Sequence, residues 1–221
     1  LNNAVFPVIG ISLLLFVIVV ARFNTFITDF SILIPIMFLI TKSSGVLLSV
    51  LLVMQEFDVR FSLTDKLCHL NKSTNCNTVL KDKSSKIFGW FGWADLGIIY
   101  FSGGLLALLI RIDLQIFQLL ALLSVLSLPY PIFSVYYQGF VLKKWCPLCL
   151  GVQVILLAEF VSLMPYISVS GFSFLDLAQF ILIFLVIGII YVQYILFFRA
   201  RSSYEKYYSK YLSFRKNPAV L

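Results

Sequence analysis

Long apolar segments are the feature of this chain that most limits its possible folds. The runs 5–21, 93–110 and 174–198 carry almost no charge and reach or approach the length that crosses a bilayer, about 20 residues. The whole chain has a mean hydropathy of +0.99, and 12% of its residues are charged, whereas charged residues make up about 25% of a soluble domain. We therefore expect an all-α integral membrane protein in contact with lipid.

Six membrane segments are predicted. They are expected at 5–21, 30–57, 93–110, 114–137, 146–166 and 174–198. Pro129 and Pro131 should kink the fourth segment. A polar loop at 58–92 separates the second from the third, and a basic, aromatic tail at 201–221 follows the sixth. The first segment lacks the basic start and small-residue cleavage site of a signal peptide, and the abrupt start of the chain suggests part of a longer protein.

The four cysteines occur as two pairs on one side of the predicted membrane. Cys68 and Cys76 lie in the loop before the third segment, and Cys146 and Cys149 open the fifth. Two crossings separate the pairs, so both are expected on the same face. Two further crossings place the tail on that face as well.

The pair Cys146 and Cys149 has the features of an exchangeable disulfide. Pro147, between them, suits the first turn of a helix, and thiols at a helix start are favoured as thiolates. Lys143 and Lys144 add positive charge nearby. Two small packing residues, or part of a metal site, are the alternatives at this point.

The loop pair makes a redox function the favoured interpretation. Cys68 and Cys76 are separated by more residues than the pairs of a zinc knuckle, which are about two to four apart. His69 keeps a mixed metal site among the alternatives. Two thiol pairs on one face suit electron transfer by thiol–disulfide exchange.

The order of these motifs resembles the vitamin K epoxide reductase family, in its bacterial form, over residues 42–166. The resemblance is carried by the loop pair, the two crossings and "WCPLC" at a helix start. "GVLLSVLL" at 45–52 and "NCNTVLKDKSSKIFG" at 75–89 are similar to the family's first core helix and to the stretch after its second loop cysteine. Quinone oxidoreductases of the DsbB type place the CxxC pair before the loop pair, the reverse of the order found here.

The resemblance implies how the chain is organised. Residues 30–167 would form a four-helix bundle around a quinone, with the cysteine loop 58–92 at one end. Residues 1–29 and 168–200 would add one transmembrane helix on each side. The tail at 201–221 would lead toward a thioredoxin-like domain.

The resemblance also implies a path for electrons. Cys68 would accept them from a thioredoxin-like protein or fused domain, and Cys76 would exchange with Cys146. Cys149 would pass them to menaquinone or ubiquinone. Such a protein supports disulfide formation in exported proteins.

Several polar residues are candidates for binding the quinone. Ser85 and Gln153 stand where the animal enzymes carry an asparagine and a tyrosine, and both side chains can donate a hydrogen bond. These departures favour quinone reduction over epoxide reduction. Asp95 is a further candidate, because an acidic group near a membrane helix end is often functional; solvation at the headgroup level is the alternative.

Aromatic residues beside the loop are expected to complete the quinone pocket. Phe88 is the main candidate, with Trp90 and Trp93 as further walls, although an interfacial aromatic belt would have the same composition. Lys42, in the middle of the second segment, is expected to extend toward the interface without a role.

Charge and chemistry disagree about orientation. Most Lys and Arg residues fall on the cysteine face or in the tail, so the positive-inside rule places the cysteines in the cytosol. Disulfide chemistry places them outside. We expect the loop to face the periplasm or exterior of an inner membrane, because tail residues that belong to a further domain are translocated largely regardless of charge.

Other classes of function remain as alternatives. One is a metal-binding membrane module, and another is a membrane anchor in which Cys68 and Cys76 only staple the loop. The basic residues lie in loops and in the tail rather than on a soluble face, so nucleic acid is not an expected partner.

Overall fold

The computed structural model describes residues 33–57, 64, 68, 74–87, 89–167 and 173–216. Regular structure in these ranges is helical apart from two isolated β-bridges, which confirms the all-α prediction. The expected first segment, 5–21, and Phe88 lie outside the described residues.

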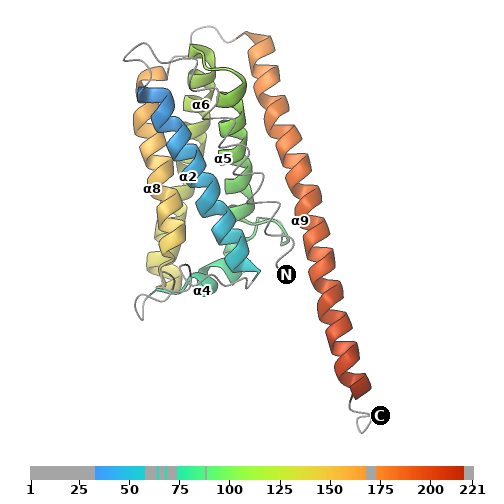
Figure 1. Ribbon diagram of the computed structural model, residues 1–221. Helices are drawn as coiled ribbons and strands as arrows, with labels where there is room; N and C mark the ends of the chain where they lie inside the picture. Colours follow the sequence, from blue (N-terminus) through green and yellow to red (C-terminus); the bar gives the residue numbers. More distant parts are fainter. Residues whose placement is uncertain are drawn as a thin grey trace.

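A bundle of apolar helices makes up most of the described fold (Figure 1). Its members are α2 (Leu33–Glu56), α5 (Trp93–Ile110), α6 (Leu114–Ser127) and α8 (Pro147–Leu163). In the described part of the chain, four stretches are long and apolar enough to cross a membrane: Pro35–Glu56, Trp93–Ile110, Leu114–Leu142 and Phe174–Arg201. Helix α8 is also apolar but shorter, with 17 residues.

The predicted fourth segment consists of three consecutive helical pieces. Helix α6 is followed by α7 (Pro129–Tyr136) and by the π-helical turn η3 (Tyr137–Leu142). The interruption falls at Leu128, directly before Pro129, because a proline has no N–H to donate to the preceding turn. The helix is thus interrupted directly before "PYP", the place where a kink was expected.

Helix α9 (Phe174–Lys216) runs along the outside of the bundle against α5 and extends past the end that carries α4 (Cys76–Lys81) (Figure 1). The predicted segment ended at 198, whereas the helix continues to Lys216. Residues 199–216 contain neither Gly nor Pro, so nothing in the sequence breaks the helix there. Pro218 follows shortly after its end.

Two clusters of buried apolar side chains fill the bundle. One is centred on α6, with Leu108, Phe117 and Leu120 among its members. The other contains all four cysteines and lies between α2, α4 and α8 at the end of the bundle that carries α4. The candidate site is built around this second cluster.

Candidate functional site

The loop cysteines are joined to each other in a buried disulfide. Cys68 and Cys76 form the bond, and neither side chain is exposed to solvent. Cys76 begins α4, whose N-cap is Asn75; the Asn75 side-chain oxygen accepts a hydrogen bond from the Thr78 N–H at 3.1 Å. Such a cap pairs a backbone donor that the helix itself cannot satisfy. The cap therefore fixes the start of α4, where Cys76 lies.

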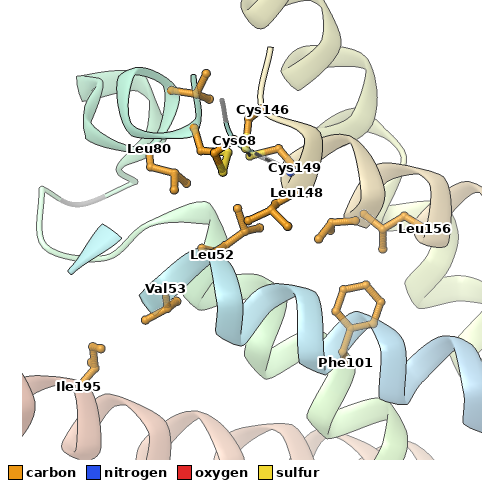
Figure 2. Close-up of a cluster of buried hydrophobic side chains, with 14 residues drawn as sticks. Leu52, Val53, Cys68, Leu80, Phe101, Cys146, Leu148, Cys149, Leu156 and Ile195 are labelled. Carbon is orange, nitrogen blue, oxygen red and sulfur yellow. Dashed lines mark hydrogen bonds between the residues drawn. A yellow bond between two sulfur atoms is a disulfide. The ribbon is translucent and has the colours of Figure 1, made fainter. Parts of the chain in front are cut away.

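Backbone pairing holds this disulfide beside the start of α8. Thr74 and Trp145 form a parallel bridge, and the Asn75 N–H donates to the Trp145 carbonyl at 3.0 Å. Because the two strands run in the same direction, Cys76 and Cys146 follow directly after the paired residues. Figure 2 shows Cys68 next to Cys146 and Cys149 at one end of the buried cluster.

The second pair occupies the first turn of α8 as two buried thiols. Cys146 is the N-cap, and Pro147 is the first helical residue, as predicted. The Cys149 N–H donates to Cys146 Sγ at 3.3 Å, and the two sulfur atoms are 2.7 Å apart. Their side chains are both buried and free of other sulfur partners. Close approach of two thiols at a helix start suits reversible disulfide formation.

A buried glutamine supports Cys146 from the preceding π-helical turn. The Cys146 N–H donates to Gln138 Oε1 at 2.8 Å, and the Lys144 N–H donates to the Gln138 carbonyl at 3.1 Å. Lys143, with a φ of 52°, takes the left-handed conformation that turns the chain from η3 back over Gln138. Gln138 thus fixes the position of the CxxC turn.

A line of polar side chains leads from Gln138 along α7. Gln138 Nε2 donates to Ser134 Oγ at 2.9 Å, and Gln153 Nε2 donates to the same oxygen at 2.6 Å. Tyr130, one further turn back, lies on the same face and lines a cavity between the helices. Tyr130, Ser134 and Gln138 were not predicted from the sequence, although their spacing of four residues places them on one helical face.

A cavity of about 400 Å³ opens beside this polar line. Its walls are mostly apolar and come from α2, α5, α6, α7 and α8. Leu96, Leu126 and Phe133 line it and are exposed on the outside of the bundle, which is the lipid-facing side for membrane helices. A mostly apolar cavity of this size, reached from the lipid side, fits a hydrophobic ring compound.

A smaller cavity adjoins the first one and reaches Cys149. The two share Leu52, Trp93, Ala94, Tyr130 and Phe133 as walls. The smaller one is lined in addition by Cys149, Ser134 and Gln138. Cys149 is therefore the cysteine that lines the smaller cavity, next to the larger one.

Ser85 lies in the wall of the smaller cavity, as its candidacy requires. Its hydroxyl oxygen is 2.6 Å from the Leu80 carbonyl and 2.7 Å from that of Asp82. A hydroxyl has only one proton to donate, so its donor is used by the backbone. Gln153 is buried next to Ser134 and lines neither cavity. Its Oε1 has no hydrogen-bond partner among the described residues.

Asp95 points toward α9 and away from both cavities. Its Oδ2 accepts from the Gly92 N–H at 2.7 Å, and its Oδ1 accepts from the Tyr191 hydroxyl at 2.5 Å. Arg199 lies 3.8 Å from Oδ2. The side chain is fully buried, so the alternative of a solvated carboxylate is wrong. The burial comes from α9, a partner whose position the local sequence does not indicate.

The predicted aromatic residues do not all meet at the site. Trp93 lines both cavities and donates from Nε1 to the Ser84 carbonyl at 3.1 Å. Trp90 is 40% exposed and lines neither. Phe88 lies outside the described residues.

Lys42 does not extend to the interface, contrary to the sequence-based expectation. It is fully buried, and its Nζ pairs with Glu159 Oε2 at 2.9 Å. Glu159, near the end of α8, was not considered as a partner. An ionisable residue inside each of two apolar segments was the available signal.

The polar groups of the larger cavity fit a quinone. Ser49 Oγ lines it, is buried, and has no hydrogen-bond partner in the described parts of the chain. A Cβ at Gly97 would lie 2.8 Å from this oxygen, so the glycine leaves room for it. A buried hydroxyl without a partner can bind a carbonyl oxygen of a ligand. Within the described ranges, no group of three or more His, Cys, Asp or Glu residues could hold a metal ion.

Comparison with known sequences agrees with this geometry. No curated protein matches the chain. The sequence model of the Vitamin K epoxide reductase family matches residues 36–164, more than half of the 221 residues. The matched range runs from the start of α2 to the end of α8 and includes both cysteine pairs and the cavities. The chain therefore belongs to the vitamin K epoxide reductase family, a family of membrane oxidoreductases.

Proposed function

We propose that this chain passes electrons from a thioredoxin-like partner, through Cys68/Cys76 and then Cys146/Cys149, to a membrane quinone. The partner, a separate protein or a fused domain, is left with a disulfide that serves exported proteins. Menaquinone and ubiquinone both have the ring and the isoprenoid chain that a mostly apolar, laterally open cavity accepts.

The observation that carries this proposal is that the two cysteine pairs lie side by side and that Cys149 lines the smaller cavity. The Asn75–Trp145 hydrogen bond holds the loop disulfide beside Cys146, and Cys149 lines the cavity at the next step. Thiol–disulfide exchange requires direct contact between sulfur atoms, and the backbone pairing of Asn75 with Trp145 supports such contact between Cys76 and Cys146. A loop stapled only for stability would not need to lie against a second thiol pair.

The side chains around the cavity have separate roles in this scheme. A bound quinone would supply the two-electron acceptor. Ser49, in the wall of the larger cavity, and Ser134, in the wall of the smaller one, would each hold one of its carbonyl oxygens. Trp93 and Tyr130, whose rings lie 5.1 Å apart at a tilt of 31°, would exclude water from the side next to Cys149.

The entry of electrons requires a change at the loop. Cys68 is fully buried in this structure, so an external dithiol can reach it only after the surrounding residues move. The loop would face the periplasm or the exterior of an inner membrane, where the disulfides it forms persist. An impermeant thiol reagent should then label Cys68 in intact, reduced cells. Labelling only after lysis would show that the loop lies on the cytosolic side.

Reconstitution of the purified protein in vesicles with a quinone and a reduced thioredoxin-like protein tests the proposal. Quinone reduction, followed by ultraviolet absorbance, should depend on the added dithiol and stop in Cys149→Ser. In Cys68→Ala it should stop with the protein dithiol but persist with a small dithiol that reaches Cys146. Trp90→Phe, outside the cavity, is the matched control. Equal rates in Cys149→Ser and the wild type would contradict the proposal.

A further inference from the structure

A buried ion pair lies inside the helix bundle, away from the cysteines. Lys42 on α2 and Glu159 on α8 are 1% and 0% exposed, with Nζ and Oε2 2.9 Å apart. The Tyr100 hydroxyl on α5 donates to the same Oε2 at 3.0 Å, and the Lys42 ammonium lies 4.1 Å from the centre of the Tyr100 ring. Three helices thus contribute to a single charged cluster.

Stability alone does not account for this cluster. A buried ion pair is commonly no more stabilising than apolar side chains of similar volume, because both charges lose their hydration. The fold nevertheless makes room for it: a Cβ at Gly104 would lie 2.8 Å from Lys42 Cε. One oxygen of the carboxylate, Glu159 Oε1, has no hydrogen-bond partner among the described residues. Ionisable groups inside membrane helices commonly move protons or bind substrates.

The cluster adjoins the end of the larger cavity that is farther from Cys149. Tyr100 and Phe101 line that cavity, and Tyr100 is the member of the cluster that faces it. On α8, Leu156 lines the cavity, and Glu159 follows three residues later on the same face. In Figure 2, Phe101 and Leu156 lie away from the cysteines. A ring in the larger cavity would therefore have the smaller cavity, which Cys149 lines, at one end and Tyr100 at the other.

We propose that Tyr100, Glu159 and Lys42 hold and deliver the proton required at the quinone oxygen farther from Cys149. This role rests on the quinone reduction proposed above. Oxidation of the Cys146/Cys149 dithiol releases two electrons and two protons, and formation of a quinol takes up two of each. Both thiols lie at one end, so the far oxygen needs its own donor.

The hydrogen bonds define the proton path. The Tyr100 hydroxyl turns from Glu159 to the far oxygen and gives up its proton. Tyr100 then regains a proton from Lys42 through Oε2, the oxygen that both groups contact. For the protons to balance, Lys42 must afterwards regain one from solvent, into which the second thiol proton is released. No other ionisable group contacts Lys42 or Glu159 in the hydrogen bonds and ion pairs of the described residues, so the path has no competing member.

Glu159→Gln and Tyr100→Phe test the proposal, because each keeps the shape of the cluster but cannot pass a proton. Quinone reduction should slow by about 10²-fold, the usual scale for loss of a general acid. Quinone affinity, measured by quenching of tryptophan fluorescence in the disulfide form, should stay within about twofold for Glu159→Gln. Gln118→Leu on α6, another buried polar position, should leave both values unchanged. A wild-type rate in Glu159→Gln would overturn the proposal.

The double variant Lys42→Met/Glu159→Met covers the case in which a single variant does not fold. Apolar replacement of both charges should preserve folding, and we expect it to bind quinone yet reduce it slowly. A wild-type rate would show that the pair is structural. Loss of quinone binding would show that the cluster only shapes the cavity, and would also overturn the proton role.

Infrared difference spectra of the oxidised protein separate this inference from the proposed function. Quinone binding should shift the Glu159 carboxylate band as Tyr100 turns away, and the shift should be absent in Tyr100→Phe. A protein that reduces quinone without this shift would refute the proton path alone. A shift without any quinone reduction by the wild type would refute the proposed function, and the proton role with it.

Discussion

The backbone N–H of Asn75 donates a hydrogen bond to the carbonyl of Trp145, and each residue is followed directly by a cysteine. Two crossings separate these residues along the chain. Their pairing places the loop disulfide against the start of α8, where Cys146 and Cys149 lie in the first turn. The functional proposal depends on this contact, and the predictions below test the contact and its surroundings.

Gln138→Leu should expose how the CxxC turn is positioned. The substitution leaves the buried N–H of Cys146 without its acceptor, so we expect the protein to lose about 1–3 kcal/mol of stability. Alkylation of Cys146 in the reduced protein should become faster as the turn loosens. Thermal unfolding in detergent and alkylation kinetics measure the two effects. Gln118→Leu should not change the alkylation rate, and equal rates in all three proteins would remove Gln138 from this role.

Ser49→Ala should separate quinone binding from stability. Because Ser49 Oγ has no partner among the described residues, its removal should leave the thermal midpoint of the quinone-free protein unchanged or slightly raised. The Kd for quinone should rise about fivefold, the effect of one lost hydrogen bond. Fluorescence quenching measures the Kd. An unchanged Kd would mean that Ser49 does not contact the quinone.

Tyr191→Phe should weaken the attachment of α9 to the bundle. The hydroxyl donates to the fully buried Asp95, and loss of the donor should cost about 1–3 kcal/mol. We expect faster hydrogen exchange in α9 and no change in the Kd for quinone, since Asp95 lines neither cavity. Tyr194→Phe, at a partly exposed position of the same helix, is the control. A raised Kd for quinone would show that Asp95 contributes to quinone binding.

The sequence allowed prediction of those parts of the fold that depend on local composition. The third segment was expected at 93–110, the bounds that α5 has. Its ends are marked by a change from polar to apolar residues, which hydropathy detects. The order of the cysteine pairs likewise indicated the family, because it reflects connectivity rather than packing. Residues 201–216 were assigned to a tail because charge, not helix propensity, guided that boundary.

Contacts between distant helices could not be predicted in this way. Lys42 and Glu159 are 117 positions apart, and Tyr191 and Asp95 are 96 apart. Hydropathy describes each segment alone and gives no information about which charged group meets which. For this reason Lys42 was expected at the interface, and Asp95 was given solvation as its alternative. The buried positions of both depend on helix packing.

The line of polar side chains along α7 could have been predicted from the sequence. Tyr130, Ser134 and Gln138 recur every four residues and therefore share one face of a helix. The prediction made for this segment was instead a kink at its two prolines. Ser85 and Gln153 were selected by resemblance, which identifies a position in the chain but not the hydrogen bonds that already occupy its side chain.

The most direct test is the trapping of the exchange between loop and helix. In Cys149→Ala, Cys146 can attack Cys76 but has no second thiol to resolve the mixed disulfide. In Cys68→Ala/Cys149→Ala, mild oxidation leaves Cys76 and Cys146 as the two cysteines able to pair. After cleavage between residues 77 and 145, the two halves of both variants should remain linked on a non-reducing gel and separate on reduction. Halves that separate without reduction would show that Cys76 does not reach Cys146, which would contradict the electron path.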